Sequence, residues 1–270
     1  MQCYLDKMLS LGKETYIFFE HDRAYKAYQL PLLKLNPVEF SESERLRKYL
    51  TSPKLYYRIN RIMRRIDGRR LCYEKEEGKY DINILRKDNV FLAGYFQTEK
   101  YFEDISEIIR SKIYFEGSDD STYSEIAKKM NEENSVSIHV RLTDYVQLKK
   151  IYGGICDTHY YQKAIEMIRE KVNNPVFYLF SDDLDAAQKM LSEYKTIPVS
   201  LNRGSKSYLD MFLMSQCRNH IIANSTFSWW GAWLNSHHDK IVIAPKRWLN
   251  TAEMPDICPK NWIRIEKGKI

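Results

Sequence analysis

The stretch Ser137-Ile-His-Val-Arg-Leu-Thr-Asp-Tyr145 decides how the rest of this chain is interpreted. The apolar, β-branched run over 136–140 is typical of a buried strand. Directly after it come a cation at Arg141, a carboxylate at Asp144 and a phenol at Tyr145. Ligands of open α/β sheets bind at the carboxyl ends of the strands, and the planar fork of arginine matches phosphate and carboxylate oxygens. The stretch therefore indicates an anion site, and the alternative is an Arg–Asp surface pair that closes a loop.

Composition narrows the class of protein without selecting a partner. The 270 residues are 44% hydrophobic, which suffices for one large domain or two small ones. The net charge of +6 comes from scattered Lys and Arg residues and suits a nucleotide, an acidic sugar, a membrane surface or nucleic acid. We predict no membrane span and no signal peptide. Five cysteines, far apart and odd in number, favour a reduced, cytoplasmic compartment.

From residue 124 onward, strand-like and helix-like segments alternate at short spacing. The predicted strands are 136–140, 176–181, 196–201, 220–224 and 240–244, and the predicted helices are 124–131, 158–172, 184–194, 205–217 and 229–234. This alternation predicts an α/β fold with a doubly wound parallel sheet. The first half is less regular, so we expect an N-terminal domain over 1–125 and a C-terminal domain over 126–270.

The irregular half contains its own elements. We predict a helix over 1–11, a strand-like run over 14–19, an apolar run over 89–97 and a helix from 101 to about 114. Six arginines between residues 58 and 70, beside Tyr56 and Tyr57, form the best nucleic-acid candidate in the chain. A solvated helix face is the favoured interpretation of this segment.

A second predicted strand ends in Phe180-Ser-Asp-Asp183, whose adjacent carboxylates suggest a metal site at first sight. Consecutive side chains of a strand point to opposite faces, however, and Asp183 is well placed to cap the next helix. Capping is therefore the favoured interpretation, and metal binding is the alternative.

The third cluster lies in Ala223-Asn-Ser-Thr-Phe-Ser-Trp-Trp-Gly-Ala-Trp-Leu234, where an apolar strand gives way to polar residues and then to an apolar helix. Hydroxyl and backbone N–H groups at a helix N-terminus form an anion site that suits a diphosphate. The candidate ligands are Asn224, Ser225, Thr226 and Ser228. A strongly capped helix with its tryptophans in the core is the alternative, and the two are compatible.

Asp210 is the sole acid in the apolar run Tyr208-Leu-Asp-Met-Phe-Leu-Met-Ser215. Such an acid is expected to be paired or to recognise a ligand, because burying an unpaired charge is costly. Two roles stay open: accepting hydrogen bonds from a purine edge, or forming a salt bridge to Arg203 or Arg218.

Together these motifs resemble the α-1,2-fucosyltransferase family, whose members transfer fucose from GDP-fucose. The resemblance rests on His139–Tyr145, on Tyr178–Asp183, and on Asp210–Ser215 leading into the long and specific run Ile222–Leu234. It covers residues 135–245 well and the first half weakly.

The resemblance implies a GT-B-like fold of two Rossmann-like halves and an inverting, metal-independent glycosyltransferase without a cofactor. L-Fucose would pass from GDP-fucose to the 2-hydroxyl of a galactose-terminated glycan. Arg141 would bind the β-phosphate, His139 and Asp210 would lie near the guanine, and Asp144 would act as general base or orient Arg141. The other implied donor-site residues are Tyr145, Asn224, Ser225, Thr226 and Ser228. The implied setting is the cytoplasm, with peripheral contact at the inner membrane face.

Two departures from the family pattern bear on activity. Many members have a second arginine after the first, where this chain has Leu142, so leaving-group stabilisation is weaker unless Lys149 or Lys150 compensates. The family also opens with a strand and a Gly-Gly-x-Gly-Asn-Gln loop, whereas this chain starts around the first helix. We therefore expect an incomplete N-terminal half. The alternatives are a truncated or inactive relative that binds sugar nucleotide or glycan without turnover and, more remotely, a nucleic-acid-binding module.

Overall fold

The computed structural model describes residues 71–86, 91–143, 145, 148–202 and 206–266. The chain divides into two compact units, one of residues 1–113 with 255–257 and one of residues 114–254 with 258–270. The domain boundary predicted near residue 125 stays a prediction. The predicted elements over 1–11 and 14–19 and the arginine-rich segment 58–70 lie outside the described residues.

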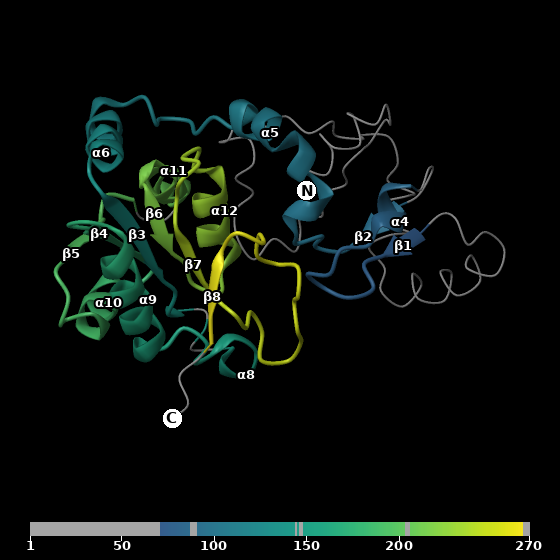
Figure 1. The fold of residues 1–270 in the computed structure, drawn as a ribbon. Helices are drawn as coiled ribbons and strands as arrows, with labels where there is room; N and C mark the ends of the chain where they lie inside the picture. Colours follow the sequence, from purple (N-terminus) through teal and green to yellow (C-terminus); the bar gives the residue numbers. More distant parts are fainter. Residues whose placement is uncertain (1–70, 87–90, 144, 146–147, 203–205, 267–270) are drawn as a thin grey trace. The chain divides into compact units, whose positions relative to one another are not determined.

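The second unit is built on a six-stranded sheet in which every pair of neighbours is parallel (Figure 1). In sheet order the strands are β5 (Thr196–Pro198), β4 (Val176–Ser181), β3 (Ser135–Val140), β6 (Asn219–Ile221), β7 (Val242–Pro245) and β8 (Ile263–Ile265). Counted along the chain from β3, this is the 3-2-1-4-5-6 order of Rossmann sheets. The order reverses between β3 and β6, and in such sheets the ligand binds beyond the carboxyl ends of the strands at that point.

Helices cover both faces of this sheet (Figure 1). They are α6 (Ser121–Glu132), α8 (Lys149–Tyr152), α9 (Thr158–Lys171), α10 (Leu184–Met190), α11 (Tyr208–Gln216) and α12 (Thr226–Leu234). Helices α9 and α10 pack on one face, while α11 packs against α12 and α6 on the other. The predicted α/β class and doubly wound parallel sheet are confirmed. The short strand β8 and the short helix α8 were missed by the sequence analysis.

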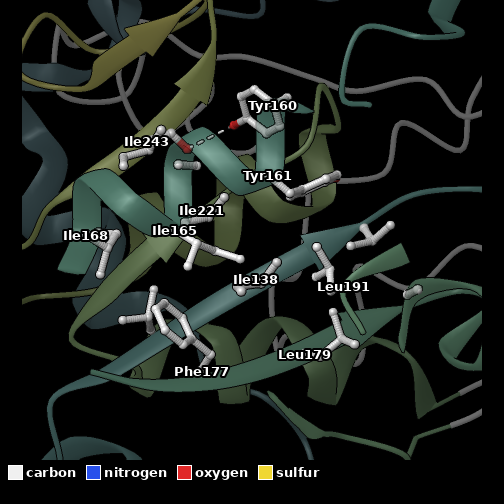
Figure 2. Packing of buried hydrophobic residues seen from close by; sticks show 14 of the residues in the cluster. Ile138, Tyr160, Tyr161, Ile165, Ile168, Phe177, Leu179, Leu191, Ile221 and Ile243 are labelled. Atoms are coloured by element: carbon white, nitrogen blue, oxygen red, sulfur yellow. Dashed lines mark hydrogen bonds between the residues drawn. The ribbon is translucent and has the colours of Figure 1, made fainter. Parts of the chain in front are cut away.

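The main core lies between the sheet and α9. Every residue of β3 is buried, as expected for a central parallel strand. The α9 residues that meet the sheet follow helical spacing: Tyr160, Tyr161, Ala164, Ile165 and Ile168. The Tyr160 hydroxyl is satisfied at the end of this core, because it lies 2.6 Å from the carbonyl oxygen of Ile222 and 3.3 Å from that of Ile243. The contact with Ile243 is drawn in Figure 2.

The opposite face of the sheet carries a buried polar network. His220 on β6 is 0% exposed, and its Nδ1 lies 2.8 Å from the Ser137 hydroxyl on β3. Its Nε2 lies 2.7 Å from the amide nitrogen of Asn235, the residue that ends α12. Burial lowers the pKa of His220 well below its usual value, so the imidazole is neutral. The network ties β3 and β6 to the carboxyl end of α12.

In the first unit, β1 (Leu71–Tyr73) and β2 (Phe91–Ala93) form a parallel pair. The other elements are α4 (Ile82–Leu85), two 3₁₀ turns over Glu99–Tyr101 and Glu103–Ile105, and α5 (Ser106–Lys112). The helix predicted from residue 101 begins only at Ser106, because Phe102 has φ −150° and ψ 13° and interrupts the helical backbone. No helix within the described ranges has the length and hydropathy needed to cross a membrane.

Candidate functional site

Arg141 follows β3 directly and lies beside Asp182, which follows β4. The two strands are parallel, and Val140 pairs with Ser181, so the next residue of each strand meets its counterpart. Arg141 Nε lies 3.3 Å from Asp182 Oδ2, and the two side chains are 17% and 15% exposed. Arg141 therefore pairs with Asp182, whereas the Arg–Asp pair within the stretch 137–145 involves Asp144 and stays a prediction. Asp144 lies outside the described residues.

Asp182 also holds the backbone of the loop that follows β3. Its Oδ1 accepts the Leu142 N–H at 2.9 Å, and its Oδ2 accepts the Thr143 N–H at 3.1 Å as well as the Thr143 hydroxyl. Partial burial favours the protonated acid. The Thr143 and Leu142 hydrogen bonds and the charge of Arg141 outweigh burial, so the pKa of Asp182 is lowered below its usual range. Asp182 is therefore a carboxylate at neutral pH.

Sequence reasoning missed the role of Asp182, although its neighbour was assigned correctly. The Asp183 carboxylate accepts the Ala186 N–H at 3.1 Å, so the predicted cap of α10 is confirmed. The signal for Asp182 was the pairing of two strands that both end in charged residues, which becomes visible only when their register is known.

His139, the second-last residue of β3, lies at the same edge. Its side chain is 3% exposed, and its ring centroid is 5.6 Å from that of Phe227 on α12. Burial, reinforced by the nearby charge of Arg141, lowers the pKa of His139 to about 3. The ring is therefore neutral, and its buried Nδ1 has no hydrogen-bond partner among the described residues.

Tyr145 connects the segment after β3 to the segment after β6, the two strands between which the strand order reverses. Its hydroxyl donates to the main-chain carbonyl oxygen of Asn224, after β6, at 2.5 Å. Its ring stacks on that of Tyr152 in α8, with the ring centroids 4.8 Å apart. Burial raises the pKa of Tyr145, so it remains a protonated phenol. Asn224 is 2% exposed and donates to the Trp248 carbonyl oxygen at 3.0 Å. Its buried Oδ1 has no hydrogen-bond partner in the described part of the chain.

The N-terminus of α12 lies just beyond Asn224. Ser225 has the extended backbone of an N-cap residue, with φ −131° and ψ 129°, but its side chain makes no capping hydrogen bond. The Ser228 hydroxyl is buried and donates to the Ser225 carbonyl oxygen at 3.2 Å, while Thr226 is exposed. The alternative of a strongly capped helix is therefore not observed at Ser225. The expected tryptophan core is confirmed for Trp229 and Trp233, which are 5% and 2% exposed, whereas Trp230 is only partly buried.

Asp210 lies in the first turn of α11 and belongs to a separate hydrogen-bonded group. It accepts from the Asn202 amide at 2.7 Å, and Asn202 accepts from the Tyr123 hydroxyl at 2.5 Å. Burial raises the pKa of Asp210 to about 7, although the Asn202 hydrogen bond opposes this. Within the described ranges, Asp210 forms no ion pair with Arg218, and Arg203 lies outside them.

The structure thus gathers five of the predicted residues at the carboxyl ends of β3 and β6: His139, Arg141, Tyr145, Asn224 and Ser225. Thr226 and Ser228 follow on the first turn of α12. Leu142 packs against the hydrophobic core cluster and is only partly exposed, while Lys149 and Lys150 are exposed on α8. The compensation expected from these lysines stays a prediction.

The family model described as "Glycosyl transferase family 11" matches residues 73–266. The chain is 38% identical over 202 residues to an "Alpha-1,2-colitosyltransferase" of Escherichia coli, covering 72% of this chain and 69% of that protein. It is 38% identical over 135 residues to the "O-antigen biosynthesis glycosyltransferase WbnK" of Escherichia coli, covering 49% and 45%. It is 31% identical over 103 residues to the "Galactoside 2-alpha-L-fucosyltransferase Sec1" of Mus musculus, covering 37% and 28%.

Among solved structures, the crystal structure of NodZ alpha-1,6-fucosyltransferase soaked with GDP-fucose aligns with a TM-score of 0.42 at 13% identity, covering 71% of this chain and 63% of that one. The family model covers most of the chain, and the resemblance found from the motifs is confirmed. The chain belongs to glycosyl transferase family 11, a family of glycosyltransferases related to the α-1,2-fucosyltransferases and colitosyltransferases.

Proposed function

We propose that this protein transfers L-fucose from GDP-fucose to the 2-hydroxyl of a galactoside, with inversion at the anomeric carbon. The observation that carries the proposal is the meeting of two anion-binding features where the strand order reverses. A guanidinium follows β3, and the positive end of α12, without a Ser225 cap, follows β6. Tyr145 joins the two segments by hydrogen bonding to Asn224.

This arrangement suits a reaction whose leaving group is a nucleoside diphosphate. Negative charge develops on the diphosphate as the glycosidic bond breaks, and fixed donors placed there lower the barrier. Arg141 and the N–H groups of the first α12 turn provide such donors without requiring a metal ion. The proposed mechanism is therefore metal-independent. Ser225, Thr226 and Ser228 complete the proposed diphosphate site.

Neutral polar groups lie close to Arg141 and to the N-terminus of α12. His139 Nδ1 and Asn224 Oδ1 are buried and unpartnered among the described residues, and a bound donor would supply partners that the protein does not. Asp210 is proposed to accept hydrogen bonds from the guanine, and Asp144 to take the proton of the attacking hydroxyl. The acceptor is proposed to be a galactose-terminated glycan assembled at the inner face of a membrane.

A colitosyl donor is the second candidate. The relative that aligns over 69% of its own length is an alpha-1,2-colitosyltransferase, while the fucosyltransferase of Mus musculus aligns over 28% of its length. Colitose is fucose without the 3-hydroxyl. A site that hydrogen-bonds this hydroxyl rejects the deoxy sugar strongly, whereas an apolar site discriminates weakly between the two. The ratio of kcat/KM for the two donors decides between these candidates.

The function is tested by incubating the 270-residue protein with GDP-fucose or GDP-colitose and a panel of galactosides. Product mass, GDP release and the anomeric configuration by NMR are the readouts. We expect a β-linked donor sugar to give an α-1,2-linked product, in the presence of EDTA as in its absence. Arg141→Ala should lower turnover about 100- to 1,000-fold, the usual effect of removing one charge-stabilising donor.

Arg169→Ala is the matched control, because Arg169 lies in the last turn of α9 and pairs with Glu166 at 3.1 Å. That variant should retain activity. Donor binding without turnover would favour an inactive relative, and salt-sensitive nucleic-acid binding that ignores Arg141 would favour the remote alternative. Loss of activity in EDTA would overturn the metal-independent mechanism.

A further inference from the structure

We propose that Asp182 is a positioning residue that holds Arg141 in the orientation needed to contact the diphosphate. The inference rests on the proposed function, since it takes the ligand of Arg141 to be a nucleoside diphosphate. It adds a residue to the site that the chain's motifs did not assign. Asp182 acts through Arg141 and through the loop that carries it.

The first step concerns the backbone. Residues 142 and 143 both donate their N–H groups to the Asp182 carboxylate, one to each oxygen, at 2.9 and 3.1 Å. The Thr143 hydroxyl donates to the same carboxylate. From the other side, Leu142 packs against the hydrophobic core cluster. The loop that begins at Arg141 is therefore fixed by a carboxylate and by core packing together.

The second step concerns the guanidinium. Asp182 Oδ2 lies 3.3 Å from Arg141 Nε, while its other oxygen is engaged with Leu142. Contact at Nε restricts the rotation of the guanidinium plane, and the edge formed by the two Nη atoms then has a defined direction. A bidentate phosphate contact uses two parallel N–H groups in that plane, so it depends on this orientation.

The third step concerns charge. Asp182 and Arg141 are 15% and 17% exposed at their side chains, so water screens their interaction only in part. Asp182 accepts charge-assisted hydrogen bonds, which are the strong class. A positioning error of about 1 Å in a catalytic group costs about 100-fold in rate. Losing this carboxylate should therefore reduce turnover even though Asp182 does not touch the substrate.

The test compares Asp182→Asn with Asp183→Asn. Both changes remove one negative charge at neighbouring positions, but Asp183 caps α10 through the Ala186 N–H, a role that asparagine also fills. We expect Asp182→Asn to lower kcat about 10- to 100-fold and to weaken GDP binding, with the acceptor KM unchanged. Asp183→Asn should remain within about threefold of the natural protein.

A double-mutant cycle separates positioning from general destabilisation. Arg141→Lys keeps the charge but removes the Nε–H and the planar fork. If Asp182 acts through Arg141, adding Asp182→Asn to Arg141→Lys should cost less than about threefold more. Equal losses in both backgrounds, or full activity of Asp182→Asn, would refute the positioning role.

A measurement without substrate keeps this inference distinct from the proposed function. The Arg141 Nε–H signal in ¹⁵N NMR, assigned with Arg141→Lys, should be protected from exchange in the natural protein and in Asp183→Asn. It should lose protection in Asp182→Asn. If no sugar nucleotide binds, the proposed function fails, while this signal still decides whether Asp182 orients Arg141.

Discussion

At the residue scale, the described residues at the carboxyl ends of β3 and β4 include a cation, Arg141, that is held by an anion, Asp182, next to neutral polar groups. His139 is neutral because its pKa is lowered to about 3, and Tyr145 keeps its proton because burial raises its pKa. Asp182 is ionised because its hydrogen bonds lower its pKa. Through the neutral pH range, Arg141 therefore supplies the positive charge for a phosphate among these described residues.

Asp210 gives a residue-scale prediction on pH. Its pKa rises from 3.8 in the unfolded chain to about 7 in the folded one, chiefly by burial. The folded state thus prefers the protonated acid. The contribution of Asp210 to the free energy of unfolding should therefore fall as the pH rises from about 4 to about 7, by up to about 4 kcal/mol at about 1.4 kcal/mol per pKa unit. Asp210→Asn should remove this contribution, so its stability relative to the natural protein should increase with pH and be the greater of the two at pH 8.

Denaturant unfolding followed by tryptophan fluorescence measures this effect, because all five tryptophans belong to the second unit. Asp185→Asn, an exposed change on α10, is the control and should keep the natural pH dependence. If Asp210→Asn is less stable than the natural protein at pH 8, the folded protein must stabilise the ionised Asp210 side chain at its buried position.

At the element scale, the position of α12 depends on close packing against α11. A Cβ at Gly231 would lie 2.9 Å from Met214 Cβ, a distance at which one helix must move. The carboxyl end of α12 is also held in place, because the amide nitrogen of Asn235 at that end lies 2.7 Å from Nε2 of buried His220. An added methyl group would therefore displace the helix whose N-terminus forms the proposed diphosphate site.

Gly231→Ala should accordingly destabilise the second unit by about 1–3 kcal/mol, the usual cost of overpacking, despite the better helix propensity of alanine. Donor KM should rise at temperatures where the variant is folded. Thermal unfolding and donor titration measure the two effects. Ser236→Ala, an exposed change just after α12, is the control. Unchanged stability together with unchanged donor KM would show that α11 moves to accommodate the methyl group while α12 keeps its position.

Also at this scale, the sequence predicted most elements of the second unit because apolar runs separated by short polar segments mark most of its strands and helices. The predicted strand 176–181 coincides with β4, and the predicted 136–140 is one residue shorter than β3. Strand β8 escaped prediction because it has three residues with an exposed arginine at its centre. Polar residues after strands predicted the site, whereas the partner of Arg141 required the register of β3 with β4.

At the scale of the whole molecule, the chain returns to the first unit near its end. Residues 255–257 belong to that unit, although the residues on either side belong to the second. Asp256 anchors this segment: its carboxylate accepts the Tyr80 N–H at 2.9 Å and pairs with Lys100 at 2.5 Å, and its own N–H donates to the Gly78 carbonyl oxygen at 2.9 Å. No sequence pattern links positions so far apart, so this anchor could not have been predicted.

Asp256→Ala should loosen the first unit, because it removes the carboxylate that accepts the Tyr80 N–H and pairs with Lys100. The partly exposed pair and the hydrogen bond to a charged group together contribute about 1–3 kcal/mol. Burial opposes ionisation, but Lys100 and Tyr80 lower the pKa of Asp256, so its stabilisation is present above pH 3.8 and is lost as the pH falls through the folded-state value.

Hydrogen exchange should show the Tyr80 amide losing protection in the variant at pH 7, and in the natural protein only in acid. Amides of α9 should keep their protection in Asp256→Ala. In Glu253→Ala, an exposed control, the Tyr80 amide and the α9 amides should both keep their protection. Equal protection of Tyr80 in both proteins at pH 7 would mean that other contacts hold residues 255–257 in the first unit.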